Sequence, residues 1–327
     1  MFLNRKIRAF GVIAALAAAA TLSACASGGT AGGETTGAPS AEFVPVQIGV
    51  GADAAYAPFF VAEREGLFEA AGLDVTLVPF ASGGDAITAL NAGQIELTQS
   101  SPATTVSQLA NNPDLTAFVK TVNLGRYNKA VLRTGVDSPA DIKNFGYVAG
   151  LGQYMAIRFL EANDIDPASV NMIPAGAQDL AALLQRGDID GFVLWEPWPA
   201  NAETAGTGRV VSTIDEFGLS LVNWLITTTS WLDENEATAH ALVAVLAESI
   251  DLIDSDPDLA ADAVESAVAI EAANARVMLG EMDFGLASIT EDDVASATDV
   301  AEFFLEAGTI EQIPDLQTAL VLDWYTD

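Results

Sequence analysis

The sequence contains a single cysteine, Cys25, and a single histidine, His240. One cysteine cannot form a disulfide within the chain, and these two residues cannot supply the Cys and His ligands of a structural zinc site. No phosphate-binding loop and no Ser/His/Asp set stands out elsewhere. We therefore expect no catalytic residue, no metal and no cofactor.

Basic residues are also scarce. The chain has 13 Lys and Arg against 45 Asp and Glu, which gives a formal net charge of −32. Phosphate recognition needs clustered Lys and Arg, so nucleic acid is excluded as a partner. The acidic balance is expected to form a solvated surface. It does not exclude an anionic ligand, because surface charges are screened over about 8 Å at physiological ionic strength.

Long apolar runs are missing except at the beginning. Residues 9–22 form an apolar stretch of about 14 residues, which is shorter than the ~20 that a spanning helix needs. Three basic residues, Arg5, Lys6 and Arg8, precede this stretch. A charged start, a short apolar run and small residues after it are typical of a secretory signal, which we assign to residues 1–24.

The apolar run ends in Leu22-Ser23-Ala24-Cys25, which resembles the lipobox of bacterial lipoproteins. The resemblance implies acylation of Cys25 and the two-chain anchoring that stable membrane attachment requires. The alternative is an ordinary signal with a chance cysteine. Residues 25–42 are rich in Gly, Ala, Ser and Thr and are expected to form a flexible tether. We therefore expect an extracytoplasmic protein anchored to the cell membrane by lipidated Cys25.

After the tether, apolar runs and helical periods alternate. We expect strands at 46–50, 73–78, 95–98 and 115–122 and helices at 59–71, 85–91 and 102–110. A β-α-β-α-β order predicts parallel pairing with right-handed crossovers.

A second round begins near Lys129, with strands at 145–149, 170–173, 189–194 and 209–214 and helices between them. Ser138-Pro139-Ala140-Asp141 predicts a capped helix start. A strand at 221–227 is expected to return to the first lobe, and from Ser230 the chain reads as almost all helix. Ser230 with Asp233 and Thr290 with Asp293 predict two further capped starts.

These two rounds predict an α/β protein with two lobes and a helical C-terminal extension. The first lobe would hold residues 44–125 plus 225–327, and the second residues 126–224. Ligands of open α/β sheets bind outside the carboxyl ends of the strands. Two facing sheets would therefore place one pocket in the cleft between the lobes.

Several motifs in the same order carry a family resemblance. They are APFFVAEREGLF at 57–68, AGLDV at 71–75, SGG at 82–84, ALNAG at 89–93, GDIDGF at 187–192 and WEP at 195–197. Together they resemble the substrate-binding proteins of the nitrate, sulfonate and taurine ABC importers, a group that includes binders of thiamin precursors. The resemblance implies the type II periplasmic-binding-protein fold, hinge closure on a small solute, and delivery to permease and ATPase subunits. We expect a monomer.

Candidate ligand contacts lie where strands end and helices begin. Glycines there let the backbone approach a ligand, and helix N-termini suit anionic oxygens. The hydroxyls can instead be helix caps, and Phe59 can be core. The candidates are Tyr56, Phe59, Ser82, Gly83, Gly84, Ser100, Ser101, Gly152, Gln153, Trp195, Glu196 and Trp198.

Glu196 is the candidate that bears most on ligand identity. It can accept a hydrogen bond from a ligand amino group or amidine beside a stacked Trp, or it can be an acidic residue favoured at a helix start. A carboxylate in the cleft disfavours a bare anion such as nitrate. We expect a small, polar, nitrogen-containing solute that resembles a sulfonate or a pyrimidine. A ligand-sensing lipoprotein, or an enzyme of the same fold, are the alternatives.

Overall fold

The structure is a computed structural model that describes residues 44–219 and 221–326. The expected signal (1–24), the lipidated Cys25 and the tether (25–42) lie outside the described residues. Within the described part, no helix is both long enough and apolar enough to cross a bilayer.

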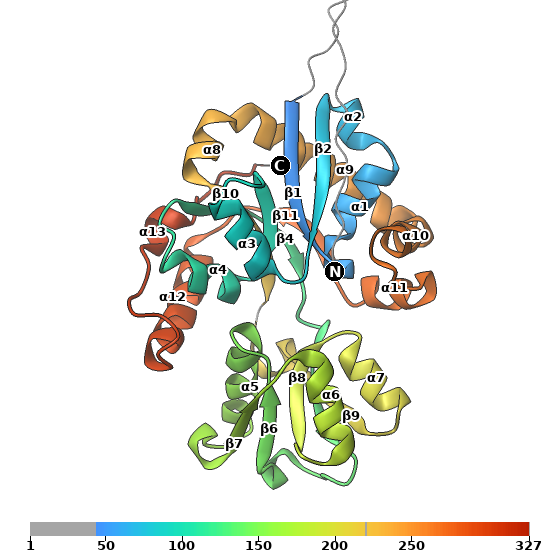
Figure 1. Ribbon diagram of the computed structural model, residues 1–327, viewed down its shortest axis with the longest axis vertical. Helices are drawn as coiled ribbons and strands as arrows, with labels where there is room; N and C mark the ends of the chain where they lie inside the picture. The colour runs from blue at the N-terminus through green and yellow to red at the C-terminus, as the bar shows by residue number, and fades with distance from the viewer. Residues whose placement is uncertain (1–43, 220, 327) are drawn as a thin grey trace, which may run out of the picture. The chain divides into compact units, whose positions relative to one another are not determined.

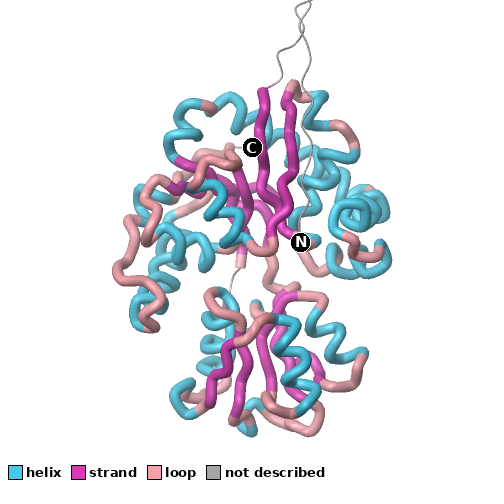
Figure 2. Tube along the Cα trace, in the orientation of Figure 1, coloured by secondary structure: helices cyan, strands magenta, loops and turns pink. Residues whose placement is uncertain are grey.

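Two β-sheets organise the chain, and Figures 1 and 2 show them as separate layers flanked by helices. The first has the strand order β11-β4-β10-β3-β1-β2 and the second β7-β6-β8-β5-β9. The strands of the first sheet are β1 (Val44–Gly51), β2 (Leu73–Phe80), β3 (Leu97–Ser100), β4 (Leu115–Asn123), β10 (Val222–Thr228) and β11 (Asp283–Ala287). Those of the second are β5 (Asn128–Arg133), β6 (Asn144–Tyr147), β7 (Asn171–Pro174), β8 (Gly191–Trp195) and β9 (Gly208–Thr213).

Helices connect the strands and form most of the C-terminal third. Before β10 they are α1 (Ala57–Arg64), α2 (Leu67–Ala70), α3 (Gly83–Asn91), α4 (Pro102–Leu109), α5 (Leu151–Ala162), α6 (Ala177–Arg186) and α7 (Trp198–Thr204). After β10 they are α8 (Thr229–Glu234), α9 (Glu236–Ser255), α10 (Pro257–Val268), α11 (Ala272–Leu279), α12 (Glu291–Glu306) and α13 (Leu316–Ala319). Short 3-10 turns lie at Ala54–Tyr56, Pro139–Asp141, Pro167–Ser169 and Asp215–Phe217.

Both faces of the first sheet are covered. Helices α1, α9, α10 and α11 contribute to one apolar cluster with β1, while α3, α4, α12 and α13 form a second cluster with β4 and β10. Figure 1 shows these two groups of helices on opposite sides of the sheet. A third cluster joins the second sheet to α6 and α7. The expected α/β class with two sheets is confirmed.

Strand pairing departs from the sequence expectation in the first sheet. Strands β1, β2 and β3 are parallel, as predicted. The prediction of an all-parallel order is wrong for β4, because β10 lies between β3 and β4 and runs antiparallel to both. A strand that re-enters the sheet from the second lobe enters at the edge facing that lobe, so it runs in the opposite direction to β3 and β4.

Two further expectations fail for local reasons. The helix expected at 59–71 is broken at Gly66, which adopts the left-handed conformation (φ 69°) and separates α1 from α2. The region after Ser230 is not all helix, because β11 adds an antiparallel edge strand to β4. Strand β4, with which β11 pairs, lies far away in the sequence, so no local sequence pattern predicted β11.

The predicted caps are mostly confirmed. Thr290 and Asp293 form a reciprocal capping box at α12, and Ser138 and Asp141 form another on a 3-10 turn. The prediction for Ser230 is wrong. Thr228 caps α8 instead, with its hydroxyl accepting a hydrogen bond from Trp231 N at 3.2 Å.

The GDIDGF motif has a structural role through Asp190. Its carboxylate accepts hydrogen bonds from Lys143 N (2.9 Å), Asn144 N (3.0 Å) and the Arg133 guanidinium (3.0 Å). Burial alone would raise the pKa of Asp190. The hydrogen bonds and the Arg133 charge outweigh this effect, so the pKa lies below its ordinary value. The Asp190 side chain, just before β8, therefore links that strand to the end of β5 and the start of β6 through hydrogen bonds.

We predict that Asp190→Asn lowers the free energy of unfolding at pH 7 by about 1–3 kcal/mol, because charged hydrogen bonds are lost. A depressed pKa stabilises the fold above the unfolded-state pKa of about 3.9, and this stabilisation disappears as the pH falls through the folded-state pKa. The difference between the two proteins should therefore shrink in acid. Urea denaturation at several pH values measures it.

The neighbouring Asp188→Asn is the matched control. Asp188 forms a surface ion pair with Arg186, with half of its side chain exposed, and its replacement should change stability by less than about 0.5 kcal/mol. Equal effects of the two substitutions would contradict the role given to Asp190.

Candidate functional site

A cavity of about 440 Å³ lies at the carboxyl ends of strands from both sheets. This volume is within the usual range for small-molecule sites, ~300–1,000 Å³. Its walls are the loops after β1, β2 and β3 in the first sheet, the loop after β6 and the end of β8 in the second, and the segments that join the sheets.

Helix starts form the first-sheet wall. Ser82 caps α3 by accepting a hydrogen bond from Asp85 N at 3.1 Å, and Ser101 caps α4 by accepting one from Thr104 N at 3.2 Å. The hydroxyls at these two positions are therefore caps as well as cavity walls. The N–H groups of the first helical turn have no partner within their helix and are available to a ligand.

The two glycines after Ser82, Gly83 and Gly84, have different surroundings. A Cβ built on Gly83 would lie 2.6 Å from Ser100 Oγ, so close packing against β3 requires glycine there. A Cβ built on Gly84 would meet no atom closer than 3.7 Å. Close packing therefore does not require glycine at residue 84, which lines the cavity.

The joining segments supply polar side chains that are almost completely buried. Tyr127 donates its hydroxyl hydrogen to Glu196 O (2.9 Å) and Asp53 Oδ1 (3.2 Å), and Asn128 donates through Nδ2 to Leu124 O (2.8 Å). Asn223, at the start of β10, is 6% exposed, and its Oδ1 has no hydrogen-bond partner among the described residues. A buried carbonyl without a partner costs free energy unless something else fills the role.

The second-sheet wall follows the same plan as the first. Gly150, with φ 80°, ends the connection from β6 and begins α5, which places Gly152 in the first turn at the cavity. Trp195, the last residue of β8, adds an aromatic wall. Helix starts from both sheets therefore open onto one cavity.

Eight of the twelve candidates from the sequence line this cavity: Tyr56, Ser82, Gly83, Gly84, Ser100, Ser101, Gly152 and Trp195. The other four, Phe59, Gln153, Glu196 and Trp198, are not among its lining residues. Phe59 is fully buried in the cluster beneath β1, and Trp198 packs against the cluster of the second sheet.

Glu196 is engaged within the protein. Its Oε1 forms an ion pair with Lys129 Nζ at 2.7 Å, and its Oε2 accepts a hydrogen bond from Ala200 N at 3.1 Å. Lys129 also forms an ion pair with Glu281. Burial alone would lower the pKa of Lys129. Hydrogen bonds and charges from Glu196 and Glu281 outweigh this effect, so the pKa of Lys129 lies above its ordinary value.

The polar cavity residues absent from the sequence candidates include Asp53, Tyr127 and Asn128. Asp53 caps the turn Ala54–Tyr56 by accepting a hydrogen bond from Ala55 N at 2.8 Å. An acid two residues after a strand was the available signal. Burial raises the pKa of Asp53. Burial, as the larger cause, and the negative charge of Asp53 both raise the pKa values of Tyr56 and Tyr127.

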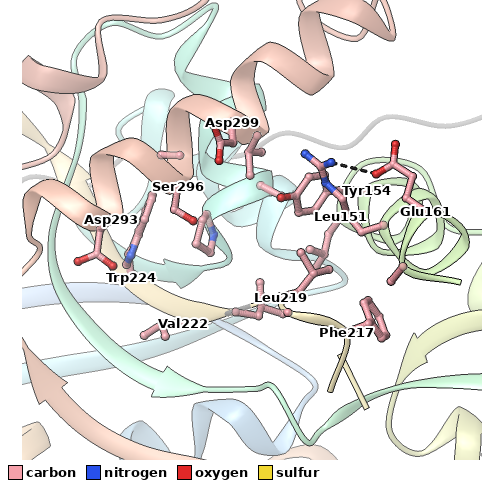
Figure 3. Close-up of a pocket in the computed structure, with 18 residues that line it drawn as sticks. Leu151, Tyr154, Glu161, Phe217, Leu219, Val222, Trp224, Asp293, Ser296 and Asp299 are labelled. Atoms are coloured by element: carbon pink, nitrogen blue, oxygen red, sulfur yellow. Dashed lines mark hydrogen bonds and ion pairs between the residues drawn. The ribbon is translucent and has the colours of Figure 1, made fainter. Parts of the chain in front are cut away.

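A second cavity of about 520 Å³ lies on the other face of β10 (Figure 3). Successive residues of a strand point to opposite faces, so Trp224 lines this cavity while Asn223 lines the first. Most charges here are paired: Arg158 binds Glu161 at 2.9 Å, the dashed line in Figure 3, and Asp293 binds Lys120 at 2.7 Å.

We take the first cavity as the candidate site because it gathers the strand ends. The second lies between α5, α12 and the segment entering β10, away from the loops after β1 and β2. The indole N–H of Trp224 has no hydrogen-bond partner among the described residues there. His240, the one histidine in the sequence, lines neither cavity and stacks on Trp324 with ring centroids 4.2 Å apart.

A family model described as the NMT1-like family matches residues 40–268, which is more than half of the chain. The chain belongs to the NMT1-like family. No curated protein sequence matches it at a significant level.

Solved structures of the same fold include three binding proteins. The periplasmic aliphatic sulphonate-binding protein of Escherichia coli is 16% identical, with a TM-score of 0.78, covering 84% of this chain and 97% of that one. The alkanesulfonate-binding protein of Xanthomonas axonopodis pv. citri, bound to MOPS, is 15% identical (TM-score 0.74; 86% and 99% covered). The periplasmic nitrate-binding protein of Synechocystis PCC 6803 is 14% identical (TM-score 0.66; 86% and 87% covered).

These likenesses establish the fold. The type II periplasmic-binding-protein architecture expected from the motifs is confirmed. The resemblance to sulfonate-binding and nitrate-binding proteins is confirmed at the level of the fold.

Two buried asparagines of this cavity allow a matched test. Asn223→Leu should leave the free energy of unfolding unchanged or raise it by up to ~1 kcal/mol, because it removes an unpaired buried carbonyl. Asn128→Leu should lower it by about 1–3 kcal/mol, because a hydrogen bond to Leu124 O is lost. Chemical denaturation compares the two. A similar loss in both variants would show that the Asn223 amide is held for the fold and not for a ligand.

Proposed function

We propose that this protein is the solute-binding component of an ABC importer and works outside the cytoplasm. The observation that carries the proposal is the cavity at the strand ends, where helix starts from both sheets and a buried unpaired amide face one space. The structures named above are binding proteins for sulfonates and nitrate, which supports the same role here.

The proposed mechanism is closure of two lobes around the solute. The chain passes between the sheets at 124–127 and again before β10 begins at Val222. We therefore place lobe 2 at 126–221, three residues shorter than the sequence suggested, and lobe 1 on either side of it. A solute that touches both lobes stabilises the closed state by its greater affinity for that state.

The residues proposed to contact the solute come from the cavity wall. On lobe 1 they include the helix starts at Ser82 to Gly84 and at Ser101, and on lobe 2 the helix start at Gly152 with the Trp195 ring. Free N–H groups and hydroxyls suit the oxygens or ring nitrogens of a small polar solute, and Tyr56 and Trp195 suit a flat one. We infer a nitrogen-containing solute of sulfonate-like or pyrimidine-like character.

We further propose that the protein binds this solute without converting it. Among the described residues that line the cavity there is no Cys, His or Lys to act as nucleophile or general base. After binding, the solute would pass to permease and ATPase subunits. A monomer tethered through Cys25 and residues 25–42 is the form proposed to do this.

A thermal-shift screen with amino-sulfonates, pyrimidines, nitrate and alkyl sulfonates tests the function. A true ligand at 100-fold its Kd adds about 2.7 kcal/mol to the stability of the native state and raises Tm. Solution scattering should then show a smaller radius of gyration with ligand than without, and mass analysis should recover the ligand unchanged. Binding without compaction would contradict lobe closure, and turnover would contradict a binding role.

Gly84→Leu locates the binding to this cavity. A Cβ at residue 84 would make only ordinary contacts, at 3.7 Å or more, and the residue lines the cavity, so the variant should fold and lose binding. Asn91→Leu places the same side chain at the exposed end of the same helix and should bind normally. Equal binding by both variants would place the solute elsewhere.

The membrane tether has its own test. Cys25→Ser removes the thiol that lipidation requires, so the protein should shift from the membrane fraction to the soluble fraction and lose the mass of the acyl chains. Ser27→Ala, two residues on, should stay in the membrane fraction. Fractionation and intact-mass measurement of both variants decide the point, and a Cys25→Ser protein that remains lipid-modified would refute it.

A further inference from the structure

The candidate cavity has an unbalanced charge. Asp53 is the one charged side chain among the described residues that line it. The sulfonate and nitrate binders of the same fold take anions by their names, yet this cavity offers no Lys, Arg or His in its described lining to match an anion. The imbalance points to a solute with the opposite charge to Asp53.

Asp53 is held with one oxygen available. Its Oδ1 accepts hydrogen bonds from Ala55 N at 2.8 Å and from the Tyr127 hydroxyl at 3.2 Å. Its Oδ2 has no hydrogen bond or ion pair to any residue in the described part of the chain. Because Oδ1 fixes the carboxylate as a helix-turn cap, Oδ2 cannot turn away without losing that cap.

The surroundings do not neutralise Asp53. The charges of Asp53, Glu196 and Glu281 all act on Tyr127, and the ammonium that faces this group is Lys129. Lys129 is already ion-paired with Glu196 and Glu281. Two of these three carboxylates pair with this ammonium, and Asp53 does not. Asp53 is partly buried, and a carboxylate withdrawn from water without a charged partner is costly, a cost that an incoming cation removes.

Asn223 gives independent support. Asn223 lines the cavity, and its buried Oδ1 lacks a partner among the described residues, so a solute that displaces the covering atoms would find a second unused acceptor. Strands β1 and β10 are separated by β3 alone, which sets their axes ~10 Å apart. Asp53, two residues after β1, and Asn223 on β10 both line the cavity, so a small molecule between them can contact both residues.

We propose that the solute carries a positively charged nitrogen, an ammonium or amidinium group, which binds Asp53 Oδ2 while another N–H of the solute donates to Asn223 Oδ1. This inference rests on the proposed binding function and names the chemical class of its ligand. Asp53 is then the residue that determines specificity, because a solute lacking the cation leaves the carboxylate unpaired.

Pairs of probes that differ in the charged nitrogen test the inference. Taurine against isethionate exchanges an ammonium for a hydroxyl, and benzamidine against benzamide exchanges an amidinium for an amide, while nitrate and ethanesulfonate serve as bare anions. By thermal shift and titration calorimetry, the cationic member of at least one pair should bind, and its partner should bind at least tenfold more weakly.

Asp53→Asn should weaken the cationic probe by roughly 10- to 100-fold, the loss expected for a charged hydrogen bond. Asparagine is also a good cap, so the turn after β1 should remain folded, which circular dichroism can check. Glu161→Gln, which removes an acid from the second cavity, is the control and should bind within twofold of the unchanged protein.

The pH dependence separates a charge partner from a merely structural residue. Burial raises the pKa of Asp53, so the affinity for the cationic probe should fall as the pH is lowered through that pKa and the carboxylate is protonated. Tyr56 and Tyr127, which interact with Asp53, have raised pKa values and keep their protons over this range. Glu196 and Glu281 lie outside the cavity lining but act on Tyr127 together with the paired Lys129, and Asp53→Asn, which retains all three, should lack the fall.

The contrary results are distinct. If nitrate or ethanesulfonate binds, and Asp53→Asn binds it as well or better, the charge inference is wrong while the binding function stands. If the affinity for a cationic probe is independent of Asp53, the inference is also wrong. If no probe of any charge binds, the proposed function fails and the inference fails with it.

Discussion

Strand β10 is the constraint on which the site depends. It fills the place between β3 and β4 and runs against both, so the backbone groups on both of its edges find partners. Its middle residues are completely buried. Because the strand is fixed in this slot, the chain must enter the first sheet beside the strand ends that form the cavity. Asn223 and Leu221 therefore become cavity residues through topology and not through local sequence.

The junction between the sheets contains a group of buried and partly buried polar and charged side chains. Tyr127 contacts the loop after β1 and the end of β8 with one hydroxyl. Lys129 joins an acid of the second sheet to Glu281, which precedes β11. The same segment thus connects the two sheets and, through Tyr127, contacts Asp53, the charged residue of the cavity lining.

Much of the fold was predictable because its signals are local. Ser82 and the Ser101-Pro102 pair mark helix starts by capping chemistry, and eight cavity residues follow from knowing where strands end. The remainder depends on partners distant in sequence. The sequence around Glu196 does not reveal its partner Lys129, which is 67 residues away. Asp53 gained its place through Tyr127, 74 residues on. No periodicity encodes such pairs.

The pairing of β10 with β4 shifts register between Asn223 and Trp224, which face Val122 and Lys120 across the ladder. One extra residue, Thr121, is thereby accommodated in β4. Side chains alternate between faces, so this insertion decides which face the last residues of β4 present as the chain leaves the sheet. A loss or gain of one residue here would turn the following residues of β4, and with them the path toward Tyr127, to the other face. The length of this strand, and not only its composition, therefore shapes the wall of the cavity.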